Sequence, residues 1–243
     1  MKKTLKVGLS LVVVGLIVGT IGFANGGAKI LMAEHQVAVP SKKEVLSKGQ
    51  FDRLNINVDN ADVMVKAGKH YQVSFTGSKK IRPTVDIKNS QLTVSQSGKI
   101  TKFNNYREHQ IVITVPADKQ LSGRIHIKNG DLDISRAMLK DTTIKSDNGD
   151  VEFHNVTLNG GQTTLSNGDF EGHRLTLQSD YRVENNNGDN EATKVREAGF
   201  ILRNESGSNE LFGKEHNGGQ QKRNQSAAHV LTLVNHNGDN EVE

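Results

Sequence analysis

The sequence predicts an all-β fold: a single-chain parallel β-helix, or β-solenoid, with coils of about 19 residues, preceded by one N-terminal transmembrane helix. Three features lead to this prediction. An Asn-Gly-Asp tripeptide recurs at a near-constant step, apolar residues flank it at a spacing of two, and a long uncharged segment follows the first lysines. Self-similarity at a near-fixed step is typical of stacked repeats.

The tripeptide occurs five times in the C-terminal half of the chain. Its turn residues are Asn129 and Gly130, Asn148 and Gly149, Asn167 and Gly168, Asn187 and Gly188, and Asn237 and Gly238. A degenerate copy, Ser206-Gly207-Ser208, follows the fourth. From glycine to glycine the steps are 19, 19, 20, 19 and 31 residues, so the last step predicts one more coil that carries an insertion.

The residues around each glycine repeat with the period of a β-strand. Apolar side chains dominate two offsets, five residues before and four residues after the glycine. The first set is Ile125, Ile144, Thr163, Val183, Leu202 and Leu233, and the second is Ile134, Phe153, Gly172, Ala192, Leu211 and Val242. In three copies the residue two after the glycine is also apolar, which gives the two-residue period of a strand and no helical pattern. Asn-Gly also favours hairpins, so a meander is the competing architecture, although a meander needs no constant step.

Composition limits the class of protein. The chain has 243 residues, 34% hydrophobic content, 24 glycines and neither tryptophan nor cysteine. This composition suits a thin, turn-rich β fold better than a thick globular core. The absence of cysteine excludes disulfides, thiol catalysis and cysteine-ligated zinc.

Charge is unevenly distributed along the chain. Residues 1–48 carry seven lysines and two glutamates, residues 49–120 carry eleven basic and six acidic residues, and residues 121–243 carry thirteen basic and nineteen acidic residues. Aromatic residues make up only 5% of the chain, so a basic patch interleaved with aromatic side chains, as in nucleic-acid binders, is missing. The basic part is expected to face an anionic membrane or cell-wall polymer, and no nucleic-acid partner is expected.

The N-terminus predicts membrane attachment. Lys2, Lys3 and Lys6 precede 22 uncharged residues, 7–28, which are long enough to span a bilayer as a helix with the rest of the chain outside the cytoplasm. A cleaved signal peptide is the alternative, with Gly22-Phe23-Ala24 as a small-x-small cleavage site. The length of the apolar run favours a retained single-pass anchor.

The remaining chain divides into three expected parts. Residues 29–48 are expected to form a stalk, and residues 49–120 an N-terminal β section that caps the stack. The Asn-Gly-Asp solenoid follows at residues 121–243, with a polar loop at residues 213–229. The last coil, which contains Glu241 and Glu243, is expected to be an exposed end whose like charges keep the chain a monomer in isolation.

Two sets of side chains could bind a metal. The tripeptide aspartates, Asp131, Asp150, Asp169, Asp189 and Asp239, are candidates for a calcium ladder. Calcium takes six to eight oxygen ligands, and one carboxylate per coil is too few alone, so a structural turn is preferred and neither metal nor cofactor is predicted. His154 and His173 share one offset, but two imidazoles without a third ligand are a poor zinc site. Motifs of serine hydrolases, zinc proteases and phosphate-binding loops are absent.

The repeated Ser-x-Asn-Gly-Asp-(Val/Phe)-Glu pattern, complete in Ser146 to Glu152 and without the second residue in Ser166 to Glu171, resembles the bacterial putative-adhesin family of unknown function. The resemblance covers roughly residues 49–243. It implies an extracytoplasmic β-solenoid and supplies no catalytic residues.

The sequence therefore predicts a non-enzymatic binding or scaffold protein of the cell envelope, anchored by its N-terminal helix. Its expected partner is an anionic cell-wall polymer or an envelope protein. The alternative is a polysaccharide-modifying β-helix enzyme, a lyase or hydrolase, which would need paired carboxylates in a lateral groove.

Overall fold

A computed structural model describes residues 43–98, 109–196 and 198–243, which all lie in one unit, Ser41–Glu243. These residues form an all-β fold with twenty strands and one short 3-10 helix, Lys79–Ile81. The strands are β1 (Glu44–Ser47), β2 (Arg53–Val58), β3 (Asp62–Gly68), β4 (Gln72–Thr76), β5 (Thr84–Lys88), β6 (Gln91–Gln96), β7 (Gln110–Pro116), β8 (Gln120–Asn129), β9 (Leu132–Ser135), β10 (Met138–Asn148), β11 (Val151–His154), β12 (Thr157–Leu165), β13 (Phe170–His173), β14 (Thr176–Leu177), β15 (Tyr181–Asn187), β16 (Asn190–Thr193), β17 (Gly199–Leu211), β18 (Glu215–Arg223), β19 (Val230–Asn237) and β20 (Asn240–Val242).

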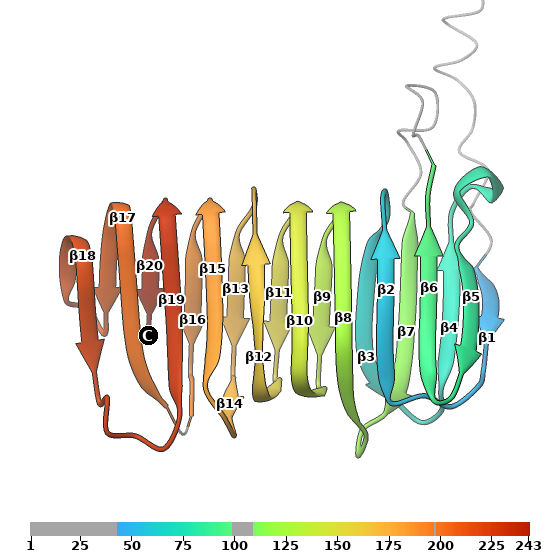
Figure 1. Cartoon of the computed structure of the whole chain (residues 1–243), viewed down its shortest axis with the longest axis horizontal. Coiled ribbons are helices and arrows are strands. Elements are labelled where there is room, and N and C mark those ends of the chain that lie inside the picture. Colours follow the sequence, from blue (N-terminus) through green and yellow to red (C-terminus); the bar gives the residue numbers. More distant parts are fainter. Residues whose placement is uncertain (1–42, 99–108, 197) are drawn as a thin grey trace, which may run out of the picture. The chain divides into compact units, whose positions relative to one another are not determined.

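Each Asn-Gly-Asp turn joins a strand of one layer to a strand of a second, facing layer (Figure 1). Successive coils pair in parallel, so that Val151 lies opposite Phe170 and Ile144 opposite Thr163, each 19 residues further along the chain. The first layer runs in the order β5-β6-β2-β8-β10-β12-β15-β19-β17-β18, and the second in the order β1-β4-β7-β3-β9-β11-β13-β16-β20, beside which lies the end of β17. This parallel stacking agrees with the predicted β-solenoid and excludes a meander for the repeat.

A thin core lies between the two layers. The apolar residues at the two predicted offsets point inward, and Ile125, Ile144, Ile134 and Phe153 are at most 1% exposed. Thr163 occupies one of these apolar offsets, and its hydroxyl lies 2.7 Å from the buried hydroxyl of Tyr181, so each polar group satisfies the other. One narrow core per coil explains how a chain with 34% hydrophobic residues forms a packed fold.

Buried amides replace apolar residues in the core of the C-terminal coils. Two residues after the glycine, the earlier coils carry Leu132, Val151 and Phe170, whereas the later coils carry Asn190, Asn240 and Asn209 at the same offset. Asn190 Nδ2 donates to Asn240 Oδ1, and Asn240 Nδ2 donates to Asn209 Oδ1, each over 2.8 Å. The three side chains thus form a buried amide ladder across three coils.

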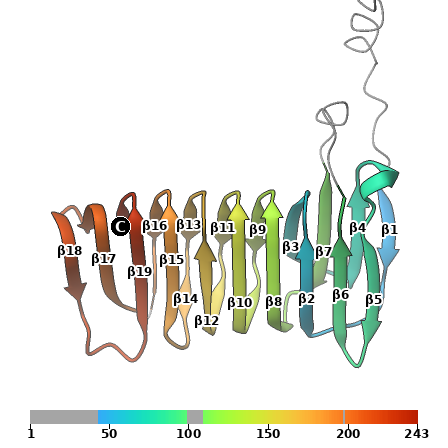
Figure 2. The same ribbon diagram turned by 45° about the horizontal axis from the view of Figure 1, so that its top comes forward.

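The order of coils in space departs from their order in the sequence at the C-terminal end. β19 lies between β15 and β17 (Figure 2). In the second layer, β20 likewise lies between β16 and the end of β17. The last coil is therefore not the exposed end of the stack, and that prediction is wrong. The reason is the hydrogen bonding between turns. The Asp239 carboxylate accepts the backbone N–H of Ser208 from the coil outside it, whereas Ser208 itself has no carboxylate that could accept the N–H of a further coil.

The N-terminal end shows the same displacement. β2 pairs with β8 and with β6, and β3 pairs with β9 and with β7. Elements β4 to β7 thus lie outside the coil that precedes them in the sequence. Antiparallel strands then end the stack, because β5 pairs with β6, β4 with β7 and β1 with β4. Residues 44–47 fall in the predicted stalk, yet they form β1, because the backbone of β4 offers them an unpaired edge.

The predicted polar loop at residues 213–229 is partly a strand. Glu215–Arg223 form β18, which pairs antiparallel with β17, and only the residues around it turn. The apolar content of this segment is too low to indicate a strand by pattern, and backbone pairing with the edge of β17 supplies the order instead.

No helix in residues 43–98, 109–196 or 198–243 is long and apolar enough to cross a bilayer. The predicted anchor at residues 7–28, and the stalk as far as residue 42, lie outside the described residues.

Candidate binding face

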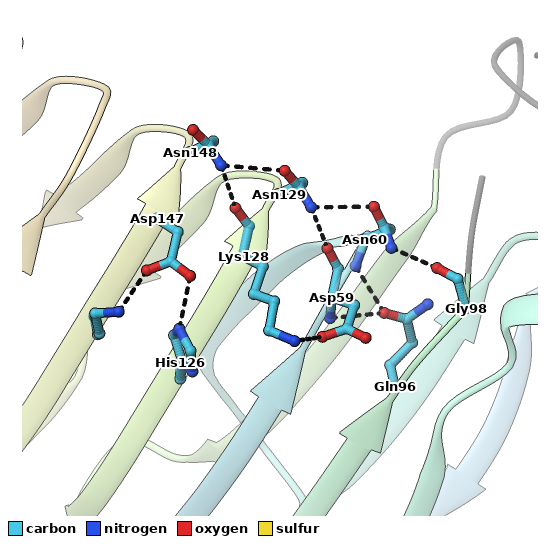
Figure 3. A network of polar contacts seen from close by, with 10 residues as sticks. Asp59, Asn60, Gln96, Gly98, His126, Lys128, Asn129, Asp147 and Asn148 are labelled. Carbon is cyan, nitrogen blue, oxygen red and sulfur yellow. Dashed lines mark hydrogen bonds and ion pairs between the residues drawn. The ribbon is translucent and has the colours of Figure 1, made fainter. Parts of the chain in front are cut away.

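The asparagines of the turns form an amide ladder along one rim of the stack. Asn148 Nδ2 donates to Asn129 Oδ1 over 3.2 Å, and Asn129 Nδ2 donates to Asn60 Oδ1 over 3.2 Å (Figure 3). The ladder continues through Asn167, Asn187 and Asn237. Each of these side chains also donates to a main-chain carbonyl of the neighbouring coil. The asparagines identified in the sequence therefore hold adjacent coils together.

The aspartates of the turns form a second ladder. Asp150 accepts the backbone N–H of Asp169 over 2.8 Å, and its own N–H is donated to Asp131 over 3.0 Å. The same bond joins Asp62 to Asp131, Asp169 to Asp189 and Asp189 to Asp239. One oxygen of each carboxylate is thus engaged by a backbone amide. Within the described ranges, no group of three or more histidines or carboxylates is placed to hold a metal ion.

A row of acidic side chains runs across the second layer, one per coil. It lies three residues after each turn glycine and contains, in spatial order, Asp133, Glu152, Glu171, Glu191, Glu241 and Glu210. Each member is directly opposite the next in the parallel register. These residues were not predicted as a site from the sequence, although all of them share the +3 offset from a turn glycine. We call these six residues the acidic row.

The acidic row is electrostatically unfavourable. Burial, together with Glu152, Glu191 and the turn aspartates, raises the pKa of the Glu171 carboxyl. Burial, followed by the Glu243 carboxyl and by Glu210, raises the pKa of Glu241. In the part of the chain that the structure describes, Glu171, Glu191, Glu210 and Glu241 have no Lys, Arg or His nitrogen within 4.0 Å. Like charges directly opposite each other on a sheet lower stability.

The Glu171→Gln substitution is expected to stabilise the protein at pH 7 by about 0.5 kcal/mol, because it removes one of the repelling charges. In a domain of this size, that gain corresponds to roughly 1–2 °C in melting temperature. Because the pKa of Glu171 is raised above 4.5, its ionised form opposes folding at neutral pH, and the penalty disappears as the pH falls through the raised pKa. The gain should therefore shrink between pH 7 and pH 4.

Thermal melts at the two pH values test this prediction, with Asp118→Asn as the control. Asp118 is exposed in the turn between β7 and β8, far from the acidic row in the register, and its ion pair with Lys119 is solvent-exposed, so its substitution should leave the melting temperature nearly unchanged. A loss of stability in Glu171→Gln at pH 7 would contradict the repulsion.

The outer face of the first layer differs, because its charges are paired. Lys128 Nζ lies 2.6 Å from Asp59, and Asp147 contacts both Lys145 and His126 (Figure 3). Further along, Arg182 contacts Glu184, and His236 lies between Glu184 and Glu205. Opposite charges neutralise one another here, either two residues apart on one strand or between neighbouring coils. The unneutralised face is that of the second layer.

The two histidines singled out in the sequence lie beside the acidic row. His154 and His173 are directly opposite each other on β11 and β13, with ring centroids 6.5 Å apart. His154 Nε2 lies 3.2 Å from Glu152, and His173 Nδ1 lies 2.7 Å from the Thr193 hydroxyl. Burial and nearby cationic side chains lower the pKa of His173. The arrangement is a pair of hydrogen-bonded polar side chains on the sheet surface.

The acidic row does not resemble the site of a glycoside-cleaving enzyme. Such enzymes hold the sugar between two carboxylates, whereas the acidic row lies on the outer surface of a sheet with one carboxylate per coil. A depression of about 410 Å³ lies elsewhere, at the starts of strands in the first layer. Its lining is Asp52, Arg53, Asn89, Ser90, Gln120, Ser122 and Lys140, which includes a single carboxylate.

Comparison with known proteins bears on the fold and the family. A family model described as Toastrack DUF4097 matches residues 51–208 and 122–243. A structure of a putative cell adhesion protein from Clostridium sporogenes is similar over 83% of this chain and 98% of its own, with 13% identity and a TM-score of 0.52. A putative adhesin from Bacteroides fragilis matches 85% of this chain and 98% of its own, with 14% identity and a TM-score of 0.41. No curated protein matches the chain.

Proposed function

We propose, from the premise that this chain belongs to the Toastrack DUF4097 family, that it is a non-enzymatic binding or scaffold protein of the cell envelope. The solved structure that shares the fold at 13% identity is described as a putative cell adhesion protein, and a binding role is consistent with that description. The proposal further assigns the acidic row as the surface that contacts the partner.

The acidic row is the observation that carries this assignment. Six carboxylates lie in register on one sheet face, where like charges opposite one another lower stability. A cationic partner would neutralise these charges, so the repulsion that lowers stability in the free protein would favour binding. We infer a partner that presents basic groups along an extended surface, with a spacing matched to coils about 4.8 Å apart.

The N-terminal part of the chain supplies the attachment in this proposal. Residues 7–28 are an uncharged segment long enough to span a bilayer, and lysines precede it. An anchor there would leave the solenoid outside the cytoplasm. The excess of basic over acidic residues in 1–120 would hold the near end of the chain against an anionic membrane or cell-wall polymer.

Binding of the full chain to envelope from cells that express it tests the role of the acidic row. Replacing Glu152, Glu171 and Glu191 by Gln should lower the bound fraction at least fivefold, and added salt should lower binding of the wild type. The matched control replaces Asp52, Asp86 and Asp118 by Asn, which changes the net charge equally at exposed sites elsewhere. Equal losses in the two triple variants would show that net charge alone decides binding.

Protease added to intact cells tests the attachment. The solenoid should be digested and leave a short membrane-bound fragment, because only residues 1–28 would be protected. Recovery of the full chain from the cytosol, or of a shortened soluble form from the medium, would contradict the anchor.

A further inference from the structure

The C-terminal coil fills a slot between two other coils. β19 pairs in parallel with β15 on one side and with β17 on the other, and β20 lies between β16 and residues 209–211 of β17. Figure 1 shows both strands flanked on each side. Both neighbouring coils come earlier in the sequence than β19 and β20. Residues 230–243 therefore have to insert between two coils that precede them in the chain.

Hydrogen bonds on both sides hold this coil in the slot. Toward the inner coil, Asn237 donates to Asn187 over 3.2 Å and the Asp239 N–H donates to Asp189 over 2.7 Å. Toward the outer coil, Asp239 accepts the Ser208 N–H over 2.6 Å. Every partner lies before residue 224, so any copy of the chain carries a complete set of them.

The slot is selective for residues 230–243. The neighbouring coil, Gly199–Leu211, has apolar residues and buried asparagines at the same offsets. However, it carries Ser206 and Ser208 where the C-terminal coil carries Asn237 and Asp239. If Gly199–Leu211 took the slot, two hydrogen bonds between turns would be lost. One is the side-chain bond to Asn187, and the other is the bond in which a carboxylate accepts the backbone N–H of the coil outside it.

One short link connects the coil to the rest of the chain. Residues 224–229, between β18 and β19, are polar or small and mostly exposed. Asn224 has a positive φ of 50°, and the Ala227 N–H donates to the Asn224 carbonyl, which closes a tight turn. Straightening this turn would let β19 and β20 leave their own stack, with the loss of this hydrogen bond and of the one that the Gly199 N–H donates to the His229 carbonyl.

We propose that the C-terminal coil exchanges between two copies of the chain, so that each copy fills the slot of the other. Release within one copy would expose Leu231, Leu233 and Val242 and leave open edges on β15 and β17. A second copy restores every ladder bond and all of the buried apolar surface, and the joined pair is a closed two-fold dimer. The partner of this edge is therefore the same segment of another copy.

The chain contains no cysteine, so engineered cysteine pairs report the exchange without background. Asn186 and His236 lie opposite each other on β15 and β19, between the register pairs Asn185–Asn235 and Asn187–Asn237. Neighbouring strands lie within the range of Cα separations that a disulfide spans. Full-length Asn186→Cys and His236→Cys chains are mixed at high concentration, taken through partially unfolding urea and back, and oxidised.

Exchange predicts a disulfide-linked heterodimer at a yield at least tenfold above that of a control mixture of Asn186→Cys with Asn57→Cys, an exposed position on β2. The double variant Asn186→Cys/His236→Cys, oxidised before the urea step, should close its disulfide internally and form no dimer. A yield less than twofold above the control would overturn the proposal. Failure of the double variant to close would contradict the coil order on which the proposal depends.

Discussion

Gly149→Val is expected to destabilise the protein by roughly 3–5 kcal/mol, the largest effect of any single substitution that we predict in the turns. Gly149 has a φ of 138°, in a region that a β-branched residue adopts only under strain. A Cβ atom at this position would also lie 2.2 Å from the Gly130 carbonyl oxygen and 2.7 Å from its carbon. Those atoms belong to the backbone of the neighbouring coil, which could move away only if the pairing between the two coils were disturbed.

Asp150→Asn is the matched control in the same turn. The amide keeps an oxygen that can accept the Asp169 N–H, and it removes one negative charge near the acidic row, so the change should stay within about 1 kcal/mol. Chemical denaturation of both variants measures the difference. Equal losses would mean that the carboxylate itself, and not the glycine backbone, holds the coils together, and would direct attention back to calcium.

Asn240→Ala is expected to destabilise the protein by about 3 kcal/mol, because it removes a fully buried side chain that makes three hydrogen bonds. Asn240 Nδ2 donates to the Arg203 carbonyl and to Asn209 Oδ1, each over 2.8 Å, and Asn240 Oδ1 accepts from Asn190. Alanine would leave one N–H of the Asn190 amide and the Asn209 Oδ1 acceptor without partners in a site closed to water, although Asn190 Nδ2 would still donate to the Val234 carbonyl.

Asn237→Ala in the same coil separates burial from hydrogen bonding. Asn237 also donates two hydrogen bonds, to Asn187 Oδ1 and to the Asn186 carbonyl, but its side chain is exposed and water can replace them. Its loss should be about 1 kcal/mol. If the two alanine variants have the same free energy of unfolding, the buried amides are no more important than those on the rim.

The acidic row could be predicted from the sequence only in part. Its residues follow the repeat, so their offset from the glycines is visible in the sequence. Their mutual proximity follows only if consecutive coils are in register, as Glu152 and Glu171 are. The repulsion between these carboxylates also depends on whether basic side chains lie nearby. On the outer face of the first layer, carboxylates at similar spacing do form ion pairs with lysine or arginine.

The structure of a single coil could be predicted from local chemistry. A turn with positive φ at Gly149 and its equivalents, strands with alternating inward residues, and a step of 19 or 20 residues all follow from local chemistry that repeats in each copy. The order of the coils in the stack could not be predicted in this way. Parallel backbone pairing accepts any coil of the right pattern, so local sequence cannot tell whether β17 or β19 lies against β15. That choice depends on Asp239, whose carboxylate lets a further coil stack outside it, and on Ser208, which ends the ladder because it has none.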